Sequence, residues 1–321
     1  MNRIIHYLAI FTMLLTFFLI FVGALVKSTE SGLSVPDWPT TFGENMFLFP
    51  ISSMVGGIFY EHSHRLIASI VGICILINTI LILLSNHLKY IKILSIITLI
   101  SVIIQGILGG LTVLFFLPAW ISTSHATLGQ TTFCLTIVLA IITSPKWITF
   151  TLSKIKSPIN LLSIYTILAV WIQLIIGAIV RHTESALVAL DFPKMNDKWI
   201  PSFSNKTISI INENRFIYNF DSIIDLEPIT SNQLFIHFLH RYWGYIVFLI
   251  ILYFAYQLYK KNNYKFISII LCLLISIQIG LGALTVLSLK HFIITSLHVS
   301  NGAAILGLLV FTSTQLHKTK I

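Results

Sequence analysis

The sequence predicts an all-α integral membrane protein with eight transmembrane helices, built as two tandem four-helix bundles related by pseudo-twofold symmetry. Three observations predict this fold. The first is composition: 56% of the 321 residues are hydrophobic and only 10% are charged, whereas charged residues make up about 25% of a soluble domain. The second is a series of apolar runs that reach the ~20 residues a helix needs to cross a bilayer. The third is an internal repeat.

The apolar runs give eight expected spans, which lie at residues 4–26, 58–84, 92–116, 122–144, 159–181, 235–258, 266–288 and 291–313. No signal-peptide cleavage site follows the first run, and no transit segment is recognisable. We therefore expect the first run to be retained as a span.

The connections between these spans fall into two sets of opposite charge. One set holds ten of the eleven acidic residues, and the eleventh is Glu61. The other set contains no acid and carries Arg3, Lys89, Lys92, Lys146, Lys154, Lys156, Lys260, Lys261, Lys265, Lys318 and Lys320. Because Lys and Arg mark the cytoplasmic side of a membrane protein, we expect both termini in the cytoplasm and the long connections 27–57 and 182–234 outside.

The net charge of +9 follows from this topology, and we expect no nucleic-acid partner because no basic patch lies on a soluble face. The chain is rich in Ile, Lys and Asn. This composition, without a transit peptide, favours the plasma membrane of a bacterium, with lipid as the surrounding partner.

The repeat is carried by polar residues within the apolar pattern. "GALVKSTESGLSVPDWP" at 23–39 matches "GAIVRHTESALVALDFP" at 177–193, an offset of 154. Offsets of 173 to 176 relate "HSHRLIASIVG" (62–72) to "HFLHRYWGYIVF" (237–248), "IQGILGGLTVL" (104–114) to "IQIGLGALTVL" (277–287), and "STSHATLGQ" to "ITSLHVSNG". The change in offset reflects a 22-residue insertion in the second outer loop. The repeat divides the chain into an N-terminal half, 1–157, and a C-terminal half, 158–321.

The repeat selects four of the eleven histidines. His64 matches His240, and His125 matches His298. Each lies a few residues into a span that enters from the outside, so the four imidazoles are expected at similar depth. Two facing imidazoles in a four-helix bundle can ligate haem iron from both sides. Interhelical hydrogen bonds, a proton relay and a non-haem metal are the alternatives, although zinc or copper would require three or four converging ligands.

The two halves differ at one acidic position. Glu61 precedes His64 by three residues and shares its helix face, whereas the matching residue of the second half is His237. A carboxylate beside a haem can move protons or stabilise a cation, so Glu61 is the candidate catalytic residue. The alternative is a salt bridge to Arg65 or Lys27.

Two arginines directly follow the first histidine of each pair. Arg65 and Arg241 are candidates to contact haem propionates near the outer surface. The alternative is that both side chains extend to the membrane interface.

Taken together, the motifs "VKSTESGLSVPDWP", "EHSHR", "HATLGQ", "HFLHR" and "LHVSNG" resemble the haem A synthase family over nearly the whole chain. The resemblance implies that His240 and His298 ligate a haem b, that His64 and His125 bind the substrate haem O, and that Glu61 is essential. Members of this family oxidise a ring methyl of haem O to the formyl group of haem A. Haem O synthase and terminal-oxidase assembly are the implied partners.

The first outer loop carries the most specific part of this resemblance. It contains Lys27, Asp37 and Trp38, which we include among the candidate functional residues. The Pro- and Gly-rich "GLSVPDWPTTFG" predicts a rigid turn, so we expect the segment 28–50 to pack over the outer end of the first half. The sequence departs from many family members in having Lys27 in place of an arginine and no cysteine pair in this loop.

Two other functions remain compatible with four paired histidines. The first is a di-haem cytochrome b that transfers electrons, although such a relay would not need Glu61. The second is a haem transporter or chaperone, in which neither haem would react. Conversion of haem O to haem A distinguishes the three functions.

Overall fold

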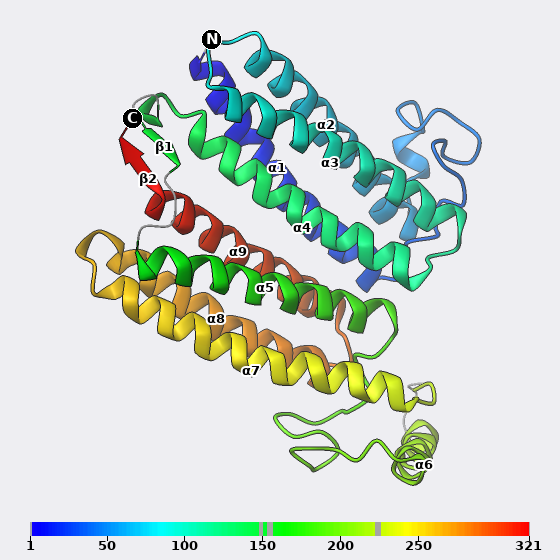
Figure 1. Cartoon of the computed structure of the whole chain (residues 1–321). Coiled ribbons are helices and arrows are strands. Elements are labelled where there is room, and N and C mark those ends of the chain that lie inside the picture. Colours follow the sequence, from blue (N-terminus) through cyan, green and yellow to red (C-terminus); the bar gives the residue numbers. More distant parts are fainter. Residues whose placement is uncertain (1, 148–149, 153–156, 222–225, 321) are drawn as a thin grey trace.

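The computed structural model describes residues 2–147, 150–152, 157–221 and 226–320 (Figure 1). Eight of its helices are long and apolar enough to cross a membrane. They are α1 (Asn2–Ser28), α2 (Gly57–Leu83), α3 (Lys89–Leu114), α4 (Ala119–Ile142), α5 (Pro158–His182), α7 (Ser231–Tyr259), α8 (Lys265–Leu287) and α9 (Phe292–Leu316). The prediction of an all-α, multi-pass membrane protein with eight spans is confirmed, and the predicted ends differ from the observed ends by only a few residues.

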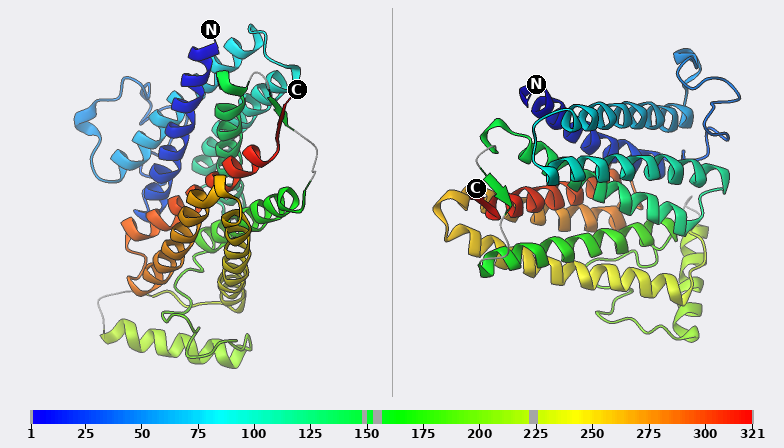
Figure 2. Two further views of the ribbon diagram at one scale, coloured as in Figure 1. Left: turned by 90° about the vertical axis from the view of Figure 1, so that its left-hand side faces the viewer. Right: turned by 45° about the horizontal axis from the view of Figure 1, so that its top comes forward.

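The helices pack in two groups of four. In the first group α1 and α3 each contact both α2 and α4, and in the second group α5 and α8 each contact both α7 and α9. The groups meet where α1 and α4 contact α9 and where α4 contacts α5. Figure 1 and Figure 2 show the chain ends at one end of the helices and both long connections near the other. A twofold relation between the groups stays a prediction.

Small residues let the two groups approach closely. A Cβ atom at Gly307 of α9 would lie 3.0 Å from side-chain atoms of Phe133 and Ile137 on α4. These two residues belong to a buried cluster that continues through Leu306 and Leu309 of α9. Apolar burial supplies little driving force inside a lipid bilayer, so close backbone approach of this kind is how membrane helices gain packing energy.

Local signals explain where several helices begin. Thr230 and Gln233 form a reciprocal capping box at the start of α7, which satisfies amide groups that have no partner in the first turn. Ser157 caps α5, where Pro158 occupies the first turn at a position that lacks an intrahelical amide bond in any case. Pro118 precedes α4. The spans therefore start where the sequence places polar or proline residues beside an apolar run.

The first parts of the two outer connections have the same backbone features at matching positions. Each includes a cis peptide bond, at Trp38–Pro39 and at Phe192–Pro193. A short antiparallel bridge follows in each, joining Thr41 to Glu44 and Met195 to Lys198. In both loops an aspartate, Asp37 or Asp191, accepts two backbone N–H groups of that turn. The offset of 154 found in the sequence therefore applies to backbone geometry as well.

The structure adds elements that we did not predict. The helix α6 (Asn205–Asp221) lies in the second outer connection, and three one-turn 3₁₀ helices occur at η1 (Ile51–Ser53), η2 (Pro145–Trp147) and η3 (Asn262–Tyr264). Two three-residue strands, β1 (Phe150–Leu152) and β2 (Lys318–Lys320), pair antiparallel. They attach the end of the chain to the connection that follows α4.

Candidate functional site

Each of the four repeat-selected histidines packs against a glycine of a neighbouring helix. A Cβ atom at Gly23 or Gly109 would lie 2.9 or 3.2 Å from Cε1 of His64 or His125. In the second half, a Cβ atom at Gly177 or Gly282 would lie 3.1 or 3.0 Å from Cε1 of His240 or His298. Any larger residue would push the imidazole away, so these glycines fix where the rings can lie.

Sequence analysis did not single out these glycines, although a signal for them was present. Gly23 matches Gly177 at the offset of 154, and Gly109 matches Gly282 at 173. All four stand inside the repeated blocks. A glycine kept in both copies, on the helix preceding a repeated histidine, indicates a close approach of side chain and backbone.

The structure brings His240 of α7 and His298 of α9 together in the second half. Their ring centroids lie 6.5 Å apart, with the ring planes at 75°. An imidazole nitrogen binds a first-row metal at about 2 Å, and the ring centroid lies about 1 Å beyond that nitrogen. Two imidazoles on opposite sides of one iron atom would therefore have centroids about 6 Å apart, which fits the observed separation.

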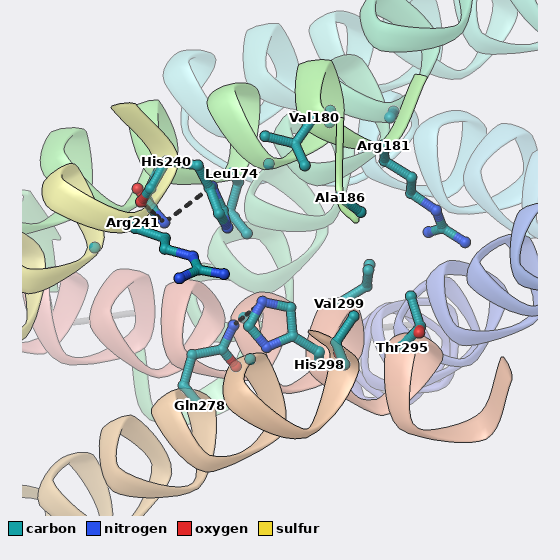
Figure 3. Close-up of a pocket in the computed structure, with 18 of the residues that line it drawn as sticks. Leu174, Val180, Arg181, Ala186, His240, Arg241, Gln278, Thr295, His298 and Val299 are labelled. Atoms are coloured by element: carbon teal, nitrogen blue, oxygen red, sulfur yellow. Dashed lines mark hydrogen bonds between the residues drawn. The ribbon is translucent and has the colours of Figure 1, made fainter. Parts of the chain in front are cut away.

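A cavity of about 590 Å³ lies among the helices of the second half, and residues of α1 and α4 such as Ser28 and Gln130 also line it (Figure 3). Its lining includes His240, His298 and Arg241, and the glycines Gly177 and Gly282. Most of its wall is apolar, with residues such as Leu174 and Val299 labelled in Figure 3. A largely apolar cavity with a few convergent polar groups is typical of a cofactor site, and the two imidazoles make this cavity suitable for a haem.

In the first half, at the positions that match His240 and His298, His64 lies on α2 and His125 on α4. The Nδ1 atom of each is buried and has no hydrogen-bond partner among the described residues. Within those same residues, no three His, Cys, Asp or Glu side chains gather in a way that could hold a metal ion. Both observations agree with paired axial ligands better than with a zinc or copper centre of three or four protein ligands.

Glu61 forms the salt bridge that we considered as the alternative to a catalytic role. Its side chain is buried, with Oε1 2.6 Å from Nη2 of Arg65. Its second oxygen accepts the N–H of Val35 at 2.8 Å. Lys27 pairs with Glu184 instead. The carboxylate thus joins α2 to the first outer loop, and its catalytic role stays a prediction.

The second half uses a neutral imidazole at the matching position. His237 lies 2.6 Å from the carbonyl oxygen of Ser185 through Nδ1, and its Nε2 accepts a hydrogen bond from Nε of Arg241 at 2.6 Å. A contact between the outer loop and the helix is therefore made here without a carboxylate, although its loop residue, Ser185, matches Ser31 and not Val35. The charge of Glu61 is the feature that distinguishes the first half here.

The two arginines hold the outer loops. Arg65 donates to the carbonyl oxygens of Val35, Asp37 and Thr40 at 2.7 to 3.1 Å. Arg241 donates to those of Ala189 and Lys194, which match Val35 and Thr40. Both guanidinium groups therefore bind carbonyl oxygens of the outer loops. Arg241 also lines the cavity, and the proposed propionate contacts stay a prediction.

The remaining candidates lie in the first outer loop. Asp37 accepts hydrogen bonds from Thr40, Gly43 and Phe42. Burial opposes ionisation of this carboxyl, but these bonds outweigh it and lower the pKa of Asp37. The indole of Trp38 lies against α3, where a Cβ atom at Gly110 would be 2.5 Å from the ring. The loop therefore contacts the outer ends of both α2 and α3.

Comparison with known proteins agrees with this arrangement. Residues 6–54 and 49–310 match the family described as COX15-CtaA, Cytochrome oxidase assembly protein. This match covers almost all of the chain. The chain belongs to this family.

Three members of this family are similar to this chain along most of their length. A heme A synthase of Halalkalibacterium halodurans is 27% identical over 289 residues, which is 86% of this chain and 85% of the relative. That of Shewanella oneidensis is 25% identical over 317 residues, covering 94% and 93%. That of Orientia tsutsugamushi is 25% identical over 324 aligned positions, covering 85% of each chain. The similarity to the Shewanella oneidensis protein, over 94% of this chain, therefore extends through both halves.

Proposed function

We propose that this protein is a haem A synthase, an enzyme that oxidises a ring methyl of haem O to the formyl group of haem A. The observation that carries the proposal is the pair of facing imidazoles, His240 and His298, beside a 590 Å³ cavity, in a chain whose full-length relatives are named heme A synthase. The histidine pair alone does not distinguish an enzyme from an electron carrier, because bis-His sites also occur in proteins that only transfer electrons.

In this proposal the second half holds a haem b. His240 and His298 are the iron ligands, and the glycines beneath them keep both rings in place. A bound haem b supplies one-electron oxidation and reduction. The apolar wall of the cavity excludes water, while Arg241 lies at the cavity with one face toward the second outer loop. Propionate contacts from Arg241 belong to the same proposal.

The first half is proposed to bind haem O through His64 and His125. Oxidation of a methyl group removes protons as well as electrons, so a nearby proton acceptor is needed. Glu61 can hold a proton on the oxygen that now faces Arg65, or stabilise positive charge near the porphyrin ring. The farnesyl tail of haem O would lie between the helices, against lipid.

The setting follows from the charge pattern. Because the basic connections mark the cytoplasmic side, we propose a bacterial plasma membrane with both termini in the cytoplasm. Haem O would arrive from a haem O synthase, and haem A would leave toward the assembly of a terminal oxidase. The family description, cytochrome oxidase assembly protein, supports this setting.

Pigment analysis tests the proposal. Purified protein in lipid nanodiscs would be supplied with haem O under turnover conditions, and the haems would then be extracted and separated. We expect haem A and its alcohol intermediate to form, and His64→Ala to abolish both. Unchanged haem O beside an intact low-spin haem b spectrum would instead indicate an electron-transfer cytochrome.

A further inference from the structure

The repeat allows the surroundings of the two histidine pairs to be compared position by position. Two carboxamides near the histidines of the second half are leucines in the first. Gln173 corresponds to Leu19 at the offset of 154, and Asn301 corresponds to Leu128 at the offset of 173. Carboxamides are costly inside a membrane unless they have partners, so their presence in one half alone calls for a reason.

In the second half, Gln173 contacts His240 directly. Its Nε2 atom lies 3.1 Å from Nδ1 of the imidazole and 3.1 Å from the carbonyl oxygen of the same residue. Gly244 leaves room for this contact, since a Cβ atom there would lie 3.2 Å from the amide nitrogen. A carboxamide can present either its oxygen or its nitrogen to the ring. In the observed orientation the amide nitrogen of Gln173 donates to the carbonyl oxygen, and its Oε1 atom has no partner among the described residues. If the carboxamide turns, Oε1 accepts the Nδ1 proton of an imidazole that ligates a metal through Nε2.

The second carboxamide acts through a neighbour. Asn301 donates to Oε1 of Gln278 at 2.7 Å and to the carbonyl oxygen of Leu274 at 2.9 Å. Gln278, held in this way, lies 3.5 Å from Nε2 of His298, as the dashed line in Figure 3 shows. We call Gln173, Gln278 and Asn301 the amide layer. Its contact to His240 is at Nδ1, whereas its contact to His298 is at Nε2 and leaves Nδ1 of His298 without a partner among the described residues.

The first half has no such layer. Leucine at positions 19 and 128 offers no hydrogen bond. Oε1 of Gln105, which matches Gln278, has no partner among the described residues, as is also true of Oε1 of Gln173 in the second half. Nδ1 of His64 also lacks a partner there, whereas the matching atom of His240 has one. Leu19 lies one helical turn before Gly23, on the face that the ring of His64 touches.

We propose that the amide layer makes the second half a site of permanent axial ligation, and that its absence makes the first half a site of ligand exchange. This inference rests on the proposed function. A ligating histidine whose second nitrogen is hydrogen-bonded is held in orientation and is a stronger donor to the metal. A cofactor haem must stay bound through many turnovers, whereas a substrate haem must enter and leave in each one.

Reciprocal variants test the proposal. Gln173→Leu gives the second half the residue of the first, and Leu19→Gln does the reverse. In the purified protein with its haem b reduced by dithionite, carbon monoxide is the probe. We expect Gln173→Leu to raise the apparent carbon monoxide affinity of haem b by about 10- to 100-fold, the usual effect of losing such a partner of a metal-bound histidine. Leu19→Gln should slow transfer of haem from the first half to apomyoglobin by about 10-fold or more.

Further variants separate a positioning role from a merely structural one. Gln173→Glu keeps a hydrogen-bond acceptor for Nδ1 and should lower the midpoint potential of haem b, whereas Gln173→Leu should raise it. Gln130→Leu removes a carboxamide that lines the same cavity but whose Oε1 atom has no partner among the described residues. It should change neither the carbon monoxide affinity nor the midpoint potential. If Gln173→Leu does not fold, Gln173→Met decides the question by the same carbon monoxide assay, because it also removes the partner of Nδ1 of His240.

The outcomes distinguish this inference from the proposed function. Haem b that binds no more carbon monoxide in folded Gln173→Leu than in wild type, with an unchanged potential, would overturn the role of the amide layer and leave the enzyme assignment standing. Absence of any low-spin haem from wild-type protein would overturn the proposed function itself. Equal effects of Gln130→Leu and Gln173→Leu would also overturn the inference, because the effect would then come from cavity polarity in general.

Discussion

At the scale of single residues, one substitution can distinguish a catalytic role of Glu61 from a structural role. Its carboxylate is bound by Arg65 and by the N–H of Val35. Glu61→Gln keeps the size of the side chain and an acceptor for the Val35 amide, but removes the charge. If Glu61 moves a proton, haem A formed per bound haem b should fall at least ~100-fold, with haem O or its alcohol accumulating.

A purely structural Glu61 would give a different result. The variant would then lose thermal stability, because the largely covered Arg65 would lose its carboxylate partner, while turnover per folded molecule would stay close to wild type. The reciprocal change His237→Glu serves as the control. It should not create a second active site, since the second half already holds haem b in this proposal.

The glycines that face the histidines give a second prediction at this scale. Gly282→Ala would place a Cβ atom 3.0 Å from Cε1 of His298, so the imidazole must shift. We expect the low-spin haem b absorption to weaken several-fold while the helix content is retained. Gly280→Ala on the same helix is the matched control, because nothing lies within 4 Å of a Cβ atom there. Equal spectra for both variants would contradict the account of the site.

At the scale of elements, the first outer loop depends on one side chain. Arg65 binds three of its carbonyl oxygens, and lysine lacks the planar fork needed to do so. Arg65→Lys should lose at least one charge-assisted hydrogen bond, about 1.5–3 kcal/mol. Cleavage of the segment 33–48 by a protease added outside vesicles should then accelerate about tenfold or more.

The second outer loop provides the internal control for that experiment, because Arg241 holds it separately. Its cleavage rate should not change. If wild-type protein is already cut rapidly in the first loop without losing activity, the loop is not a functional lid.

Sequence patterns predicted the long elements well and the short ones poorly. The eight spans follow from apolar length alone, which the bilayer imposes. The helix α6 has no such constraint: its sequence, "NKTISIINENRFIYNFD", is polar on average and is stabilised by contacts such as those of Arg215 with the carbonyl oxygens of Leu187 and Glu227. Contacts of this kind depend on tertiary placement, which a sequence pattern does not contain.

At the scale of the whole molecule, ionic contacts link the two halves at their outer ends. Glu184, which follows α5, lies 2.5 Å from Lys27 of α1 and 3.0 Å from Lys290 before α9. Nearby, Arg181 donates to Ser28, which also accepts a hydrogen bond from Ser296. Polar contacts therefore hold the two halves together at the outer end, and apolar packing around Gly307 holds them together deeper in the membrane.

This link predicts a dependence of stability on pH. Burial opposes ionisation of Glu184, but Lys27 and Lys290 outweigh it and lower its pKa below the ordinary value. A lowered carboxyl pKa stabilises the fold above the ordinary value and ceases to do so as pH falls through the lowered one. Glu184→Gln should therefore be less stable at neutral pH by no more than about 1 kcal/mol, because the side chain is half exposed.

Thermal unfolding in detergent at a series of pH values checks this prediction. The difference between wild type and Glu184→Gln should shrink as the pH drops below about 4.5. A difference that stays constant down to pH 3 would mean that the charge of Glu184 does not contribute. Lys206→Gln, on the exposed surface of α6, is a suitable control for a general loss of charge.

In the candidate site, too, the sequence identified the residues, whereas most of their contacts became known only from the folded structure. The four histidines emerged from the repeat, because ligand type and spacing are properties of the chain. The pairing of Glu61 with Arg65, four residues apart on one helix, was among the alternatives that the sequence offered. The pairing of Lys27 with Glu184 was not, because it depends on how the two halves meet. The contact of Gln173 with His240 likewise required the relative rotation of α5 and α7, which no single-helix pattern specifies.

The most direct test of the central claim is the haem composition of membranes from a bacterium that makes haem O but no haem A. Expression of this chain should produce haem A, at the expense of haem O, together with one low-spin haem b per molecule. A protein that acquires its haem b while haem O alone accumulates would contradict the account and identify the chain as an electron carrier or a haem-binding protein.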